Sequence, residues 1–589
     1  MDKSVFCIPT SIVSGDLAEK FRNIAAAGFD GVELSISDVV GSDASLDEIA
    51  QMARDAGLAI TALGPLAYPK TPMKIAAKVA MARALGASIL IVDAHSTTED
   101  ILPDLTTLDD VRIALRPTRQ SEADVLDLIA SLDCPNVGIA LNAFDVLGDG
   151  SRPARLREID GARVFHVQLS DGPQTPMMPG QGTLNLAGFL RVLVRAGYDG
   201  PWCVTSAQQG HNTIKNGYRA LVTLLSDVAL TEPRLRGRIP DLPPKVAATG
   251  IEFIEFAVDE ASRVELAAML SSMAFRQERR HFSKAATLWR QGAVNIVVNQ
   301  EAKGHAHHAF CEHGPVVCDM GLRVKNADET VARAKALGSP DFNQAVGVGE
   351  LSIPAIRGVG GALMHFIDET SDHHRVWDIE FEPVGRTKAH QPAGLRRIDH
   401  VAQTMKYEEM QSWLLYYLST FKMRKSPIVN VADPSGVIYS QALESPEGEV
   451  RMNLNGALGQ NTMAGSFLAE KSGAGVQHIA FQTDDIFETS AILQRSGFAR
   501  LQIAPNYYAE TQSEFDLDAD LVGKMQSASI LYDQDELGAY FQIYGQTIFS
   551  GFFFEIVERR NRYAGYGARN AAIRLAAQAK ARSKKKIAS

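Results

Sequence analysis

Short apolar runs alternate with helical patterns through the first 228 residues. Between the runs lie segments such as LAEKFRNIAAAG and AGFLRVLVRAG, in which apolar residues recur at helical spacing and a glycine follows the last turn. The runs number eight, and strand–helix units repeated in this way predict a TIM-type α/β barrel. The predicted strands are SVFCIPT (4–10), FDGVELS (29–35), AITALGP (59–65), SILIVDA (88–94), VRIALRP (111–117), VGIALNAF (137–144), RVFHVQLSD (163–171) and PWCVTSA (201–207).

The composition then changes. Residues 229–247 are rich in proline and arginine and have no apolar period, which indicates a linker. Two stretches of similar pattern follow, 248–384 and 395–560: GIEFIEFAVDE opens the first as IDHVAQTM opens the second, VVCDMGLRV parallels VQHIAFQTD, and ALMHFIDE parallels FFFEIVE. The stretches are predicted to be internal repeats, and residues 561–589 are predicted to form a closing helix and a basic tail.

Three residues of the second repeat have the chemistry of metal ligands. His400, His478 and Glu555 fall in separate strand-like runs at nearly equal intervals. An ionised Glu among aromatic residues needs a strong partner, because burying an unpaired charge is costly. Two histidines and a carboxylate form the facial triad of non-haem iron sites. The sequence therefore predicts one divalent metal ion, Fe(II), with Mg, Mn or Co as alternatives. The competing interpretation is a solvated Glu at a strand end and two core histidines.

The same runs resemble known enzymes. IDHVAQTM, GAGVQHIAFQTDDI and QIYGQTIFSGFFFEIVERR resemble 4-hydroxyphenylpyruvate dioxygenase, which has the vicinal-oxygen-chelate fold. NYYAE, ILYDQD and YAGYGARNAAIRLAAQA are more similar to a narrower group, bacterial 3-dehydroshikimate dehydratase, in which a sugar-phosphate-isomerase-like barrel precedes a dioxygenase-like domain. The resemblance covers nearly the whole chain. It implies a xylose-isomerase-like α/β barrel followed by an α+β domain of paired βαβββ modules.

The barrel departs from the residues that this resemblance implies. Dehydratase barrels bind a divalent metal through two Glu, an Asp and a Gln, and of these only Gln168 is present. Asn142 stands where the Asp is expected, and Ala114 and Thr205 stand where the two Glu are expected. Asn is a weaker ligand for a hard cation than a carboxylate, so Gln168 and Asn142 are interpreted as the remnant of a lost metal site. The alternative is a different site built from other residues at strand ends, namely Glu33, Asp93, His95 and Asp145.

In the second repeat the resemblance also implies a substrate pocket. Four polar residues and one aromatic residue match side chains that line the dioxygenase pocket. Each of them could instead be an ordinary strand residue at the surface. The five residues are Ser440, Asn455, Gln477, Gln542 and Phe553.

The first repeat lacks the triad. Its ligand positions read a Phe, Asp319 and either His365 or Phe366, so this repeat is predicted to be structural. Its histidines between 305 and 313 are predicted to lie in a loop and to be solvated. A zinc site formed by them with Cys311 and Cys318 is disfavoured, because structural zinc sites bring a tighter pair of ligands on each side.

Composition limits the expected partners. The chain of 589 residues is 46% hydrophobic and 22% charged, with a formal net charge of −10. These values are ordinary for a globular protein and give no argument for nucleic acid or an anionic membrane surface. The five cysteines include no CxxC pair, which suits a reducing compartment, and no apolar run is long enough for a membrane span. We therefore expect a cytoplasmic protein, a small-molecule substrate of the aryl or hydroaromatic keto acid class, and self-association into a homo-oligomer.

Three functions follow from these observations. The favoured one is a dioxygenase-like Fe(II) enzyme of aromatic or hydroaromatic acid catabolism, whose C-terminal site acts on an α-keto acid. The second is dehydration of 3-dehydroshikimate to protocatechuate in the barrel, with the C-terminal domain as an accessory. The third is a non-catalytic metal-binding module for assembly or ligand sensing.

Overall fold

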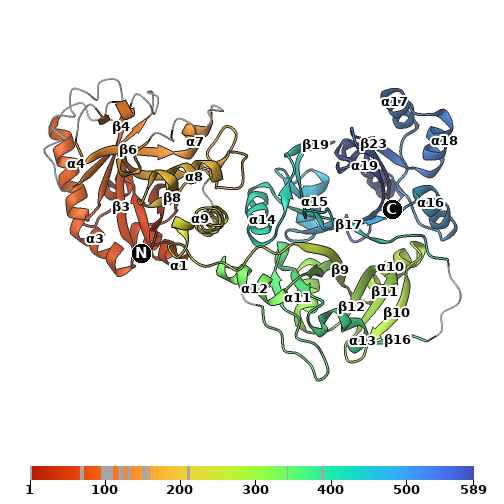
Figure 1. Ribbon diagram of the computed structural model, residues 1–589. Helices are drawn as coiled ribbons and strands as arrows, with labels where there is room; N and C mark the ends of the chain where they lie inside the picture. The colour runs from red at the N-terminus through yellow and green to blue at the C-terminus, as the bar shows by residue number, and fades with distance from the viewer. Residues whose placement is uncertain are drawn as a thin grey trace. The chain divides into compact units, whose positions relative to one another are not determined.

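The structure is a computed structural model in which the chain forms two compact units, Met1–Leu242 and Pro243–Ser589 (Figure 1). It describes residues 3–66, 72–94, 111–117, 125–127, 129–130, 134–148, 156, 159–208, 212–340, 342–385 and 391–588, without the side chains of 72–75 and 584–588. The domain boundaries predicted from the sequence pattern stay predictions. Within the described residues, no helix is both long and apolar enough to cross a membrane.

The first unit is a closed barrel of eight strands, β1 to β8 in chain order, and β1 pairs with β8 in parallel to close it. Each predicted strand is present, seven of them shortened and β3 one residue longer than predicted. The strands are β1 Phe6–Pro9, β2 Gly31–Leu34, β3 Ala59–Leu66, β4 Ile89–Ala94, β5 Arg112–Pro117, β6 Val137–Asn142, β7 Val164–Leu169 and β8 Trp202–Val204. The helices are α1 Leu17–Ala26, α2 Ile36–Val40, α3 Leu46–Asp55, α4 Pro72–Leu85, α7 Ala143–Leu147, α8 Leu186–Ala196 and α9 Thr213–Ala229.

Local signals in the sequence set the helix ends of the barrel. Ser45 and Glu48 form a reciprocal capping box at the start of α3, which satisfies two backbone N–H groups that have no partner inside the helix. Gly197 ends α8 in the left-handed region, with φ 92°, a conformation that glycine adopts without steric cost. These ends keep the connections short, so that consecutive strands lie side by side in the barrel.

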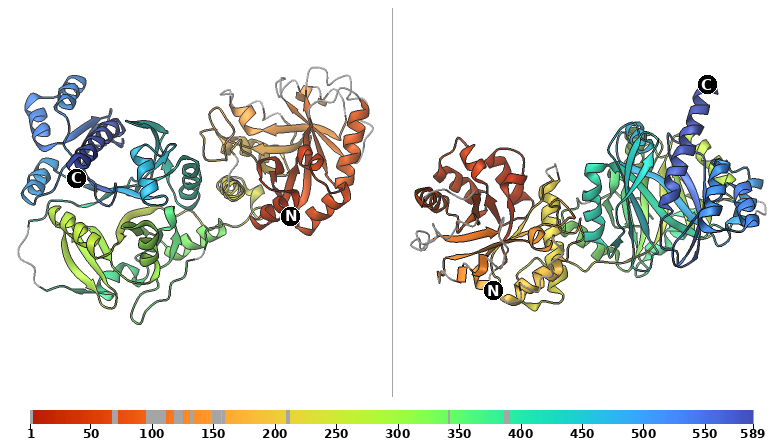
Figure 2. Two further views of the ribbon diagram at one scale, coloured as in Figure 1. Left: turned by 180° about the vertical axis from the view of Figure 1, so that it is seen from behind. Right: turned by 90° about the horizontal axis from the view of Figure 1, so that it is seen from above.

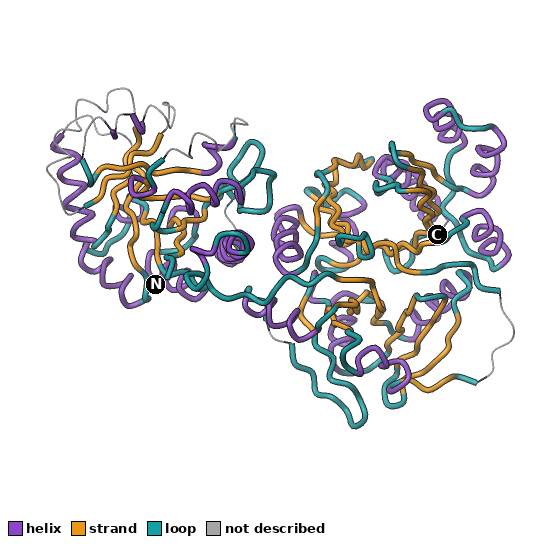
Figure 3. Tube along the Cα trace, in the orientation of Figure 1, coloured by secondary structure: helices purple, strands orange, loops and turns teal. Residues whose placement is uncertain are grey.

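The second unit contains two sheets, whose strands are drawn in orange in Figure 3, and they share a core order: β24-β25-β22-β17-β21-β20 of the second matches β14-β15-β13-β9-β12-β11 of the first. The first has the order β14-β15-β13-β9-β12-β11-β10-β16, and the second, read backwards, has the order β23-β24-β25-β22-β17-β21-β20-β18. In the first sheet β9 pairs antiparallel with β13, and β13 pairs in parallel with β15. In the second sheet β17 pairs antiparallel with β22, and β22 pairs in parallel with β25. The sheets therefore confirm the predicted pair of modules and the overall fold class.

The elements of the first repeat have the following bounds. The strands are β9 Ala248–Ala257, β10 Arg276–His281, β11 Ala286–Gln291, β12 Val294–Asn299, β13 Val316–Val324, β14 Ala355–Arg357, β15 Leu363–Ile367 and β16 Phe381–Pro383. The helices are α10 Glu260–Ser272, α11 Gly304–His313, α12 Ala327–Ala336 and α13 Val376–Ile379. The predicted loop over 305–313 is wrong, because these histidines lie on α11. His305 Nε2 donates to the backbone carbonyl of Cys318 at 3.0 Å, which ties the helix to β13.

The elements of the second repeat have the following bounds. The strands are β17 Arg397–Lys406, β18 Arg424–Lys425, β19 Val429–Asp433, β20 Gly436–Glu444, β21 Arg451–Ala457, β22 Gly475–Gln482, β23 Leu531–Gln534, β24 Gly538–Tyr544 and β25 Phe553–Asn561. The helices are α14 Tyr407–Thr420, α15 Met463–Glu470, α16 Ile486–Arg495, α17 Pro505–Phe515, α18 Ala519–Ala528 and α19 Ala568–Ala588. The closing helix α19 packs against β19 and β23 (Figure 2).

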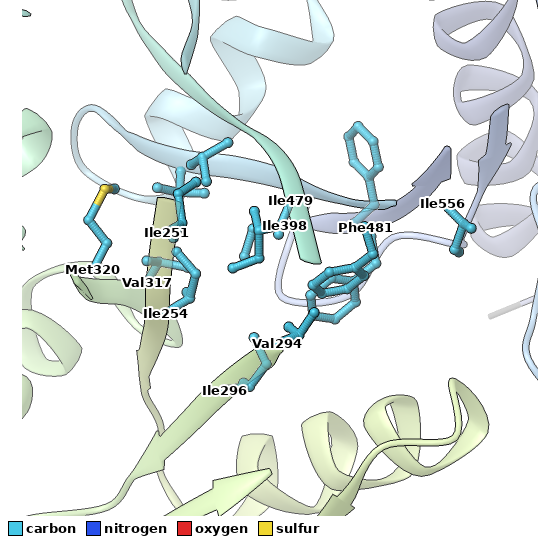
Figure 4. Close-up of a cluster of buried hydrophobic side chains, with 14 of the residues drawn as sticks. Ile251, Ile254, Val294, Ile296, Val317, Met320, Ile398, Ile479, Phe481 and Ile556 are labelled. Atoms are coloured by element: carbon cyan, nitrogen blue, oxygen red, sulfur yellow. The ribbon is translucent and has the colours of Figure 1, made fainter. Parts of the chain in front are cut away.

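One hydrophobic core joins the two repeats. Ile251, Ile254, Ile398, Ile479 and Ile556 are all buried in it (Figure 4). Aromatic rings also meet across the repeats, with centroids 5.3 Å apart for Phe256 and Phe552 and 5.4 Å apart for Phe275 and Phe481. Since alternate residues of a strand point to opposite faces, burying one face of β17, β22 and β25 in this core leaves the other face for a site.

Candidate metal centre and barrel site

The three predicted ligands of the second repeat converge. His400 lies on β17, His478 on β22 and Glu555 on β25, and β22 is paired with both of the other strands. His400 Nε2 is 3.2 Å from His478 Nε2, and each of these nitrogens is 3.5 Å from Glu555 Oε2. All three side chains are buried. Three neighbouring strands therefore bring residues far apart in the sequence to one point.

This geometry fits a divalent ion. Bonds from a metal to imidazole nitrogen or carboxylate oxygen are about 2.0–2.2 Å long, and a triangle of atoms 3.2–3.5 Å apart has room for an ion at that distance from each corner. Two unprotonated histidine nitrogens and a carboxylate oxygen aimed at one point are also a suitable donor set. The residues present thus fit a bound metal ion.

A buried carboxylate orients the first ligand. Asp399 Oδ1 accepts a hydrogen bond from His400 Nδ1 at 2.9 Å. With the proton held on Nδ1, the lone pair of Nε2 is left for a metal. Asp399 is the extra residue of a β-bulge, because the pairing of β17 with β22 skips from Ile398 to His400, and bulges redirect side chains in this way. Arg559 holds the carboxylate from the other side with hydrogen bonds of 2.8 and 2.9 Å. Sequence reasoning missed Asp399 and Arg559, although an Asp directly before the His was a usable signal.

The charges of the site depend on one another. Burial raises the pKa of Asp399, but the charge and hydrogen bonds of Arg559 and the bond from His400 outweigh it, so this pKa is well below its usual range. Burial lowers the pKa of His400, but hydrogen bonds to Asp399 and Glu555 outweigh it and raise this pKa. Burial, together with the charges of His400 and Arg574, lowers the pKa of His478. A bound cation would replace the proton of His400, since only neutral imidazole ligates.

The carboxylate ligand is fixed by a chain of amides. Gln542 Nε2 donates to Glu555 Oε1 at 2.8 Å, and Gln542 Oε1 accepts from Asn570 Nδ2 at 2.7 Å. Gln542 comes from β24 and Asn570 from α19. The closing helix therefore takes part in holding the ligand, which the pattern of the sequence did not reveal.

A cavity of about 70 Å³ lies beside the triad. Four of the five predicted pocket residues line it, and the fifth does not: the Phe553 ring is stacked on His478 with centroids 4.7 Å apart. Gln477 Oε1 also accepts from Thr404 at 2.7 Å. The four lining residues are Ser440, Asn455, Gln477 and Gln542, and the lining side chains that the sequence reasoning missed include Asn453, Tyr566 and Arg574.

The barrel contains a different arrangement. Glu33 Oε2 accepts hydrogen bonds from His166 Nε2 at 2.8 Å and Gln168 Nε2 at 2.7 Å, and Cys203 Sγ is 3.6 Å away. Burial raises the pKa of Glu33, but the hydrogen bond and charge of His166 and the other two donors outweigh it and lower this pKa. Sequence reasoning singled out Glu33 and missed His166 and Cys203, which lie two residues before Gln168 and Thr205, residues that it did name.

The barrel residues do not fit the metal that the family resemblance implies. Asn142 Nδ2 donates to Gln168 Oε1 at 3.1 Å, and Asn142 Oδ1 accepts from the Phe144 backbone and from Ser170. Ala114, a buried residue of β5, has no ligand atom. Glu33, His166 and Cys203 do lie close enough to share an ion, but the carboxylate oxygen that would bind it already accepts three donors.

The other strand-end residues form separate contacts. Asp93 accepts from Arg116 Nε at 2.8 Å. Burial raises the pKa of Asp145, and the charge of Arg116 lowers it by less. His95 lies outside the described residues. The structure thus does not join Asp93 or Asp145 to Glu33 in one site.

The first repeat carries no triad. The strand pairing places Phe253, Asp319 and His365 at the positions of His400, His478 and Glu555. The residue equivalent to Glu555 is therefore His365 and not Phe366. Asp319 Oδ2 and His365 Nδ1 are 2.7 Å apart.

Cys311 and Cys318 belong to no group of potential metal ligands within the described residues. Cys311 Sγ instead lies 3.5 Å from His307 Nε2, one helical turn away on α11. The predicted absence of a zinc site stays a prediction.

Comparison with known proteins covers both units. The family described as "Xylose isomerase-like TIM barrel" matches residues 21–224, and "Hydroxyphenylpyruvate dioxygenase, HPPD, N-terminal" matches residues 244–382. A solved "xylose isomerase-like TIM barrel/4-hydroxyphenylpyruvate dioxygenase fusion protein" is 33% identical, with a TM-score of 0.89 over 98% of this chain and 100% of that one. The fold class predicted from the sequence is confirmed.

Curated relatives decide between the predicted functions. A 3-dehydroshikimate dehydratase of Pseudomonas putida is 34% identical, and one of Pseudomonas aeruginosa is 33% identical, each over 98% of both chains. A 4-hydroxyphenylpyruvate dioxygenase of Pseudomonas aeruginosa is 30% identical over only 55% of this chain and 92% of its own length. The favoured prediction of a dioxygenase is therefore wrong, because the relatives that match from end to end are dehydratases. The chain belongs to the family of 3-dehydroshikimate dehydratases in which an isomerase-like barrel is fused to a dioxygenase-like domain.

Proposed function

We propose that this protein is a lyase that dehydrates 3-dehydroshikimate to protocatechuate, and that the reaction takes place in the barrel. The observation that supports this most is the similarity to two dehydratases over 98% of both chains. The second repeat alone would also be consistent with a dioxygenase, but the barrel is not needed for that activity. The substrate is accordingly a small hydroaromatic keto acid.

The reaction needs a base and a proton donor. A proton leaves the carbon next to the ketone, and the ring hydroxyl at the following carbon leaves as water after it receives a proton. Glu33 and His166 are the pair suited to these steps, because Glu33 is an ionised carboxylate and His166 is bonded to it through Nε2. His166 Nδ1 is buried and has no hydrogen-bond partner among the described residues. One proton can therefore pass between the pair and a substrate.

No step is assigned to a metal ion in the barrel, since its residues do not fit one. The negative charge that develops on the ketone oxygen needs hydrogen-bond donors instead. The amide groups of Gln168 and Asn142 lie beside Glu33 and are joined to each other, so a substrate that displaces one of these bonds would gain a donor. We assign both amides this role of positioning and charge stabilisation.

Turnover of 3-dehydroshikimate by the purified full-length protein tests the proposal, with protocatechuate measured by its aromatic absorbance. We expect Glu33→Gln to reduce kcat by roughly 100-fold or more, because loss of a general base costs about 10²–10⁴ in rate. Glu19→Gln, at an exposed carboxylate of α1, is the matched control. Absence of turnover in the wild-type protein would overturn the proposed function. Loss of turnover on chelation, restored by metal even when His478 is replaced, would overturn the metal-free barrel.

We further propose that the C-terminal triad holds one divalent ion, with Fe(II) as the expected metal, since two histidines and a carboxylate are typical of non-haem Fe(II) sites. Elemental analysis of the wild-type protein, His478→Ala and Gln168→Ala tests this assignment. We expect about one ion per chain, lost only in His478→Ala. Light scattering of the same samples tests the predicted self-association into a homo-oligomer.

A further inference from the structure

The cavity beside the C-terminal triad is lined by two chemically different kinds of group. His400, His478 and Glu555 line it with the chemistry of metal ligands, and Arg574 of α19 lines it with a guanidinium. The rest of the lining combines apolar side chains such as Val431, Ile438 and Leu575 with the neutral polar side chains of Ser440, Asn453, Asn455, Gln477 and Gln542. A ligand of this cavity would thus meet a metal site and a guanidinium at the same time.

Arg574 forms no ion pair with a described acidic residue, although the charges of Glu555 and Asp433 act on it. Its guanidinium donates to Gln578 Oε1 at 2.7 Å and lies 4.9 Å from the centre of the Phe553 ring and 5.7 Å from that of Tyr544. Among the described residues, no carboxylate oxygen is within 4.0 Å of it, whereas Arg569 on the same helix pairs with Glu510. A guanidinium held against aromatic rings without an ion pair is costly to desolvate, so an anionic ligand would stabilise this arrangement.

The triad adds a second requirement. Three protein ligands leave positions open on the ion, and two adjacent oxygen atoms of one molecule can fill two of them. A planar guanidinium binds a carboxylate through two parallel hydrogen bonds. The small volume of about 70 Å³ limits the ligand to a compact molecule.

From these features we infer that the C-terminal cavity binds a single-ring carboxylate with two adjacent ring oxygens, with the oxygens at the triad and the carboxylate at Arg574. The product of the proposed dehydration has this chemistry, and naming that molecule rests on the proposed function; the ligand class does not. The dioxygenase-like domain then contains a binding site for a ring acid of the class that the barrel is proposed to convert, separate from the site in the barrel.

Calorimetric binding to the full-length protein, loaded with one equivalent of the redox-inert ion Zn²⁺, tests the inference. The probes are 3,4-dihydroxybenzoate, catechol, which lacks the carboxylate, and benzoate, which lacks the adjacent oxygens. The wild-type protein should bind 3,4-dihydroxybenzoate most tightly. In Arg574→Gln we expect that affinity to fall roughly 10- to 100-fold, as for loss of a hydrogen-bonded charge, and the affinity for catechol to stay within about twofold.

Arg582→Gln is the matched control, because Arg582 is a cation of the same helix that pairs with Glu470 outside the cavity. Equal losses in Arg574→Gln and Arg582→Gln, equal binding of catechol and 3,4-dihydroxybenzoate by the wild-type protein, or no binding at all would overturn the inference. Turnover of 3-dehydroshikimate is measured on the same preparation. Turnover without binding refutes only the cavity's ligand, and binding without turnover refutes only the proposed function.

Discussion

The two repeats of the second unit share a sheet order but differ at the point where a metal site forms. In the second repeat the core strands present two histidines and a glutamate, whose ligand atoms converge. In the first repeat the same strand positions hold Phe253, Asp319 and His365. Phe253 offers no ligand atom, so the remaining acid and histidine pair with each other at 2.7 Å. The topology supplies three converging positions, and the residue types decide whether they bind a metal.

The bulge is common to both repeats. In the first repeat the pairing of β13 with β9 skips Glu252, which stands where Asp399 stands in the second. Glu252 bonds to Trp377 Nε1 at 2.8 Å and pairs with Arg323, rather than with a histidine. The acidic residue at the bulge therefore binds structural partners in the first repeat, whereas in the second repeat it orients the metal ligand His400.

The largest expected effect is removal of a ligand. In His478→Ala we expect metal affinity to fall more than 100-fold, beyond the 10–100-fold that loss of an outer partner causes, and the ion to be absent after dialysis. His365→Ala, at the equivalent region of the first repeat, should leave the metal content unchanged. Elemental analysis of both variants measures this difference. A loss of metal in His365→Ala would contradict the division of roles between the repeats.

A smaller effect is expected from the residue behind the ligand. Asp399→Asn should weaken metal binding by roughly 10- to 100-fold, because the amide no longer holds the Nδ1 proton of His400 with a full negative charge. Glu252→Gln is the control at the matching bulge. Competition with a chromophoric chelator gives both affinities. Equal affinity in wild type and Asp399→Asn would show that the bulge carboxylate does not act on the metal.

The sequence predicts the scaffold better than the contacts behind the site. Strand alternation and recurring runs were sufficient for the barrel, the paired modules and the convergence of His400, His478 and Glu555. The sequence pattern did not indicate a role for Arg574, because an arginine on a terminal helix is usually solvated. Only the packing of the helix shows that this side chain lines the cavity. The hydrogen bond between Glu33 on β2 and His166 on β7 was equally hidden, since the two residues meet only when the barrel closes β1 against β8.

The stability of the first repeat should depend on pH through the buried carboxyl group of Glu255. Desolvation and the charge of Asp319 raise the pKa of Glu255 from 4.5 to about 7. The folded state then binds more protons than the unfolded state between these values, so the free energy of unfolding falls as pH rises through that window. Glu255→Gln should flatten this fall and stabilise the protein at pH 8 by several degrees in Tm. Thermal unfolding from pH 5 to 8 measures it, with Glu265→Gln on the exposed face of α10 as the control. An unchanged slope would contradict the raised pKa.

A last comparison separates the two arginines that bind the bulge acids, Arg559 and Arg323. Arg559 is 7% exposed and binds Asp399 twice, whereas Arg323 is 39% exposed and pairs once with Glu252. Removing one partner of a buried pair costs about 3–5 kcal/mol, and removing an exposed partner costs about 1 kcal/mol or less. In denaturant unfolding, Arg559→Gln should therefore lower the free energy of unfolding much more than Arg323→Gln. Similar losses in the two variants would contradict the idea that the buried Arg559–Asp399 pair stabilises the protein more than the exposed Arg323–Glu252 pair.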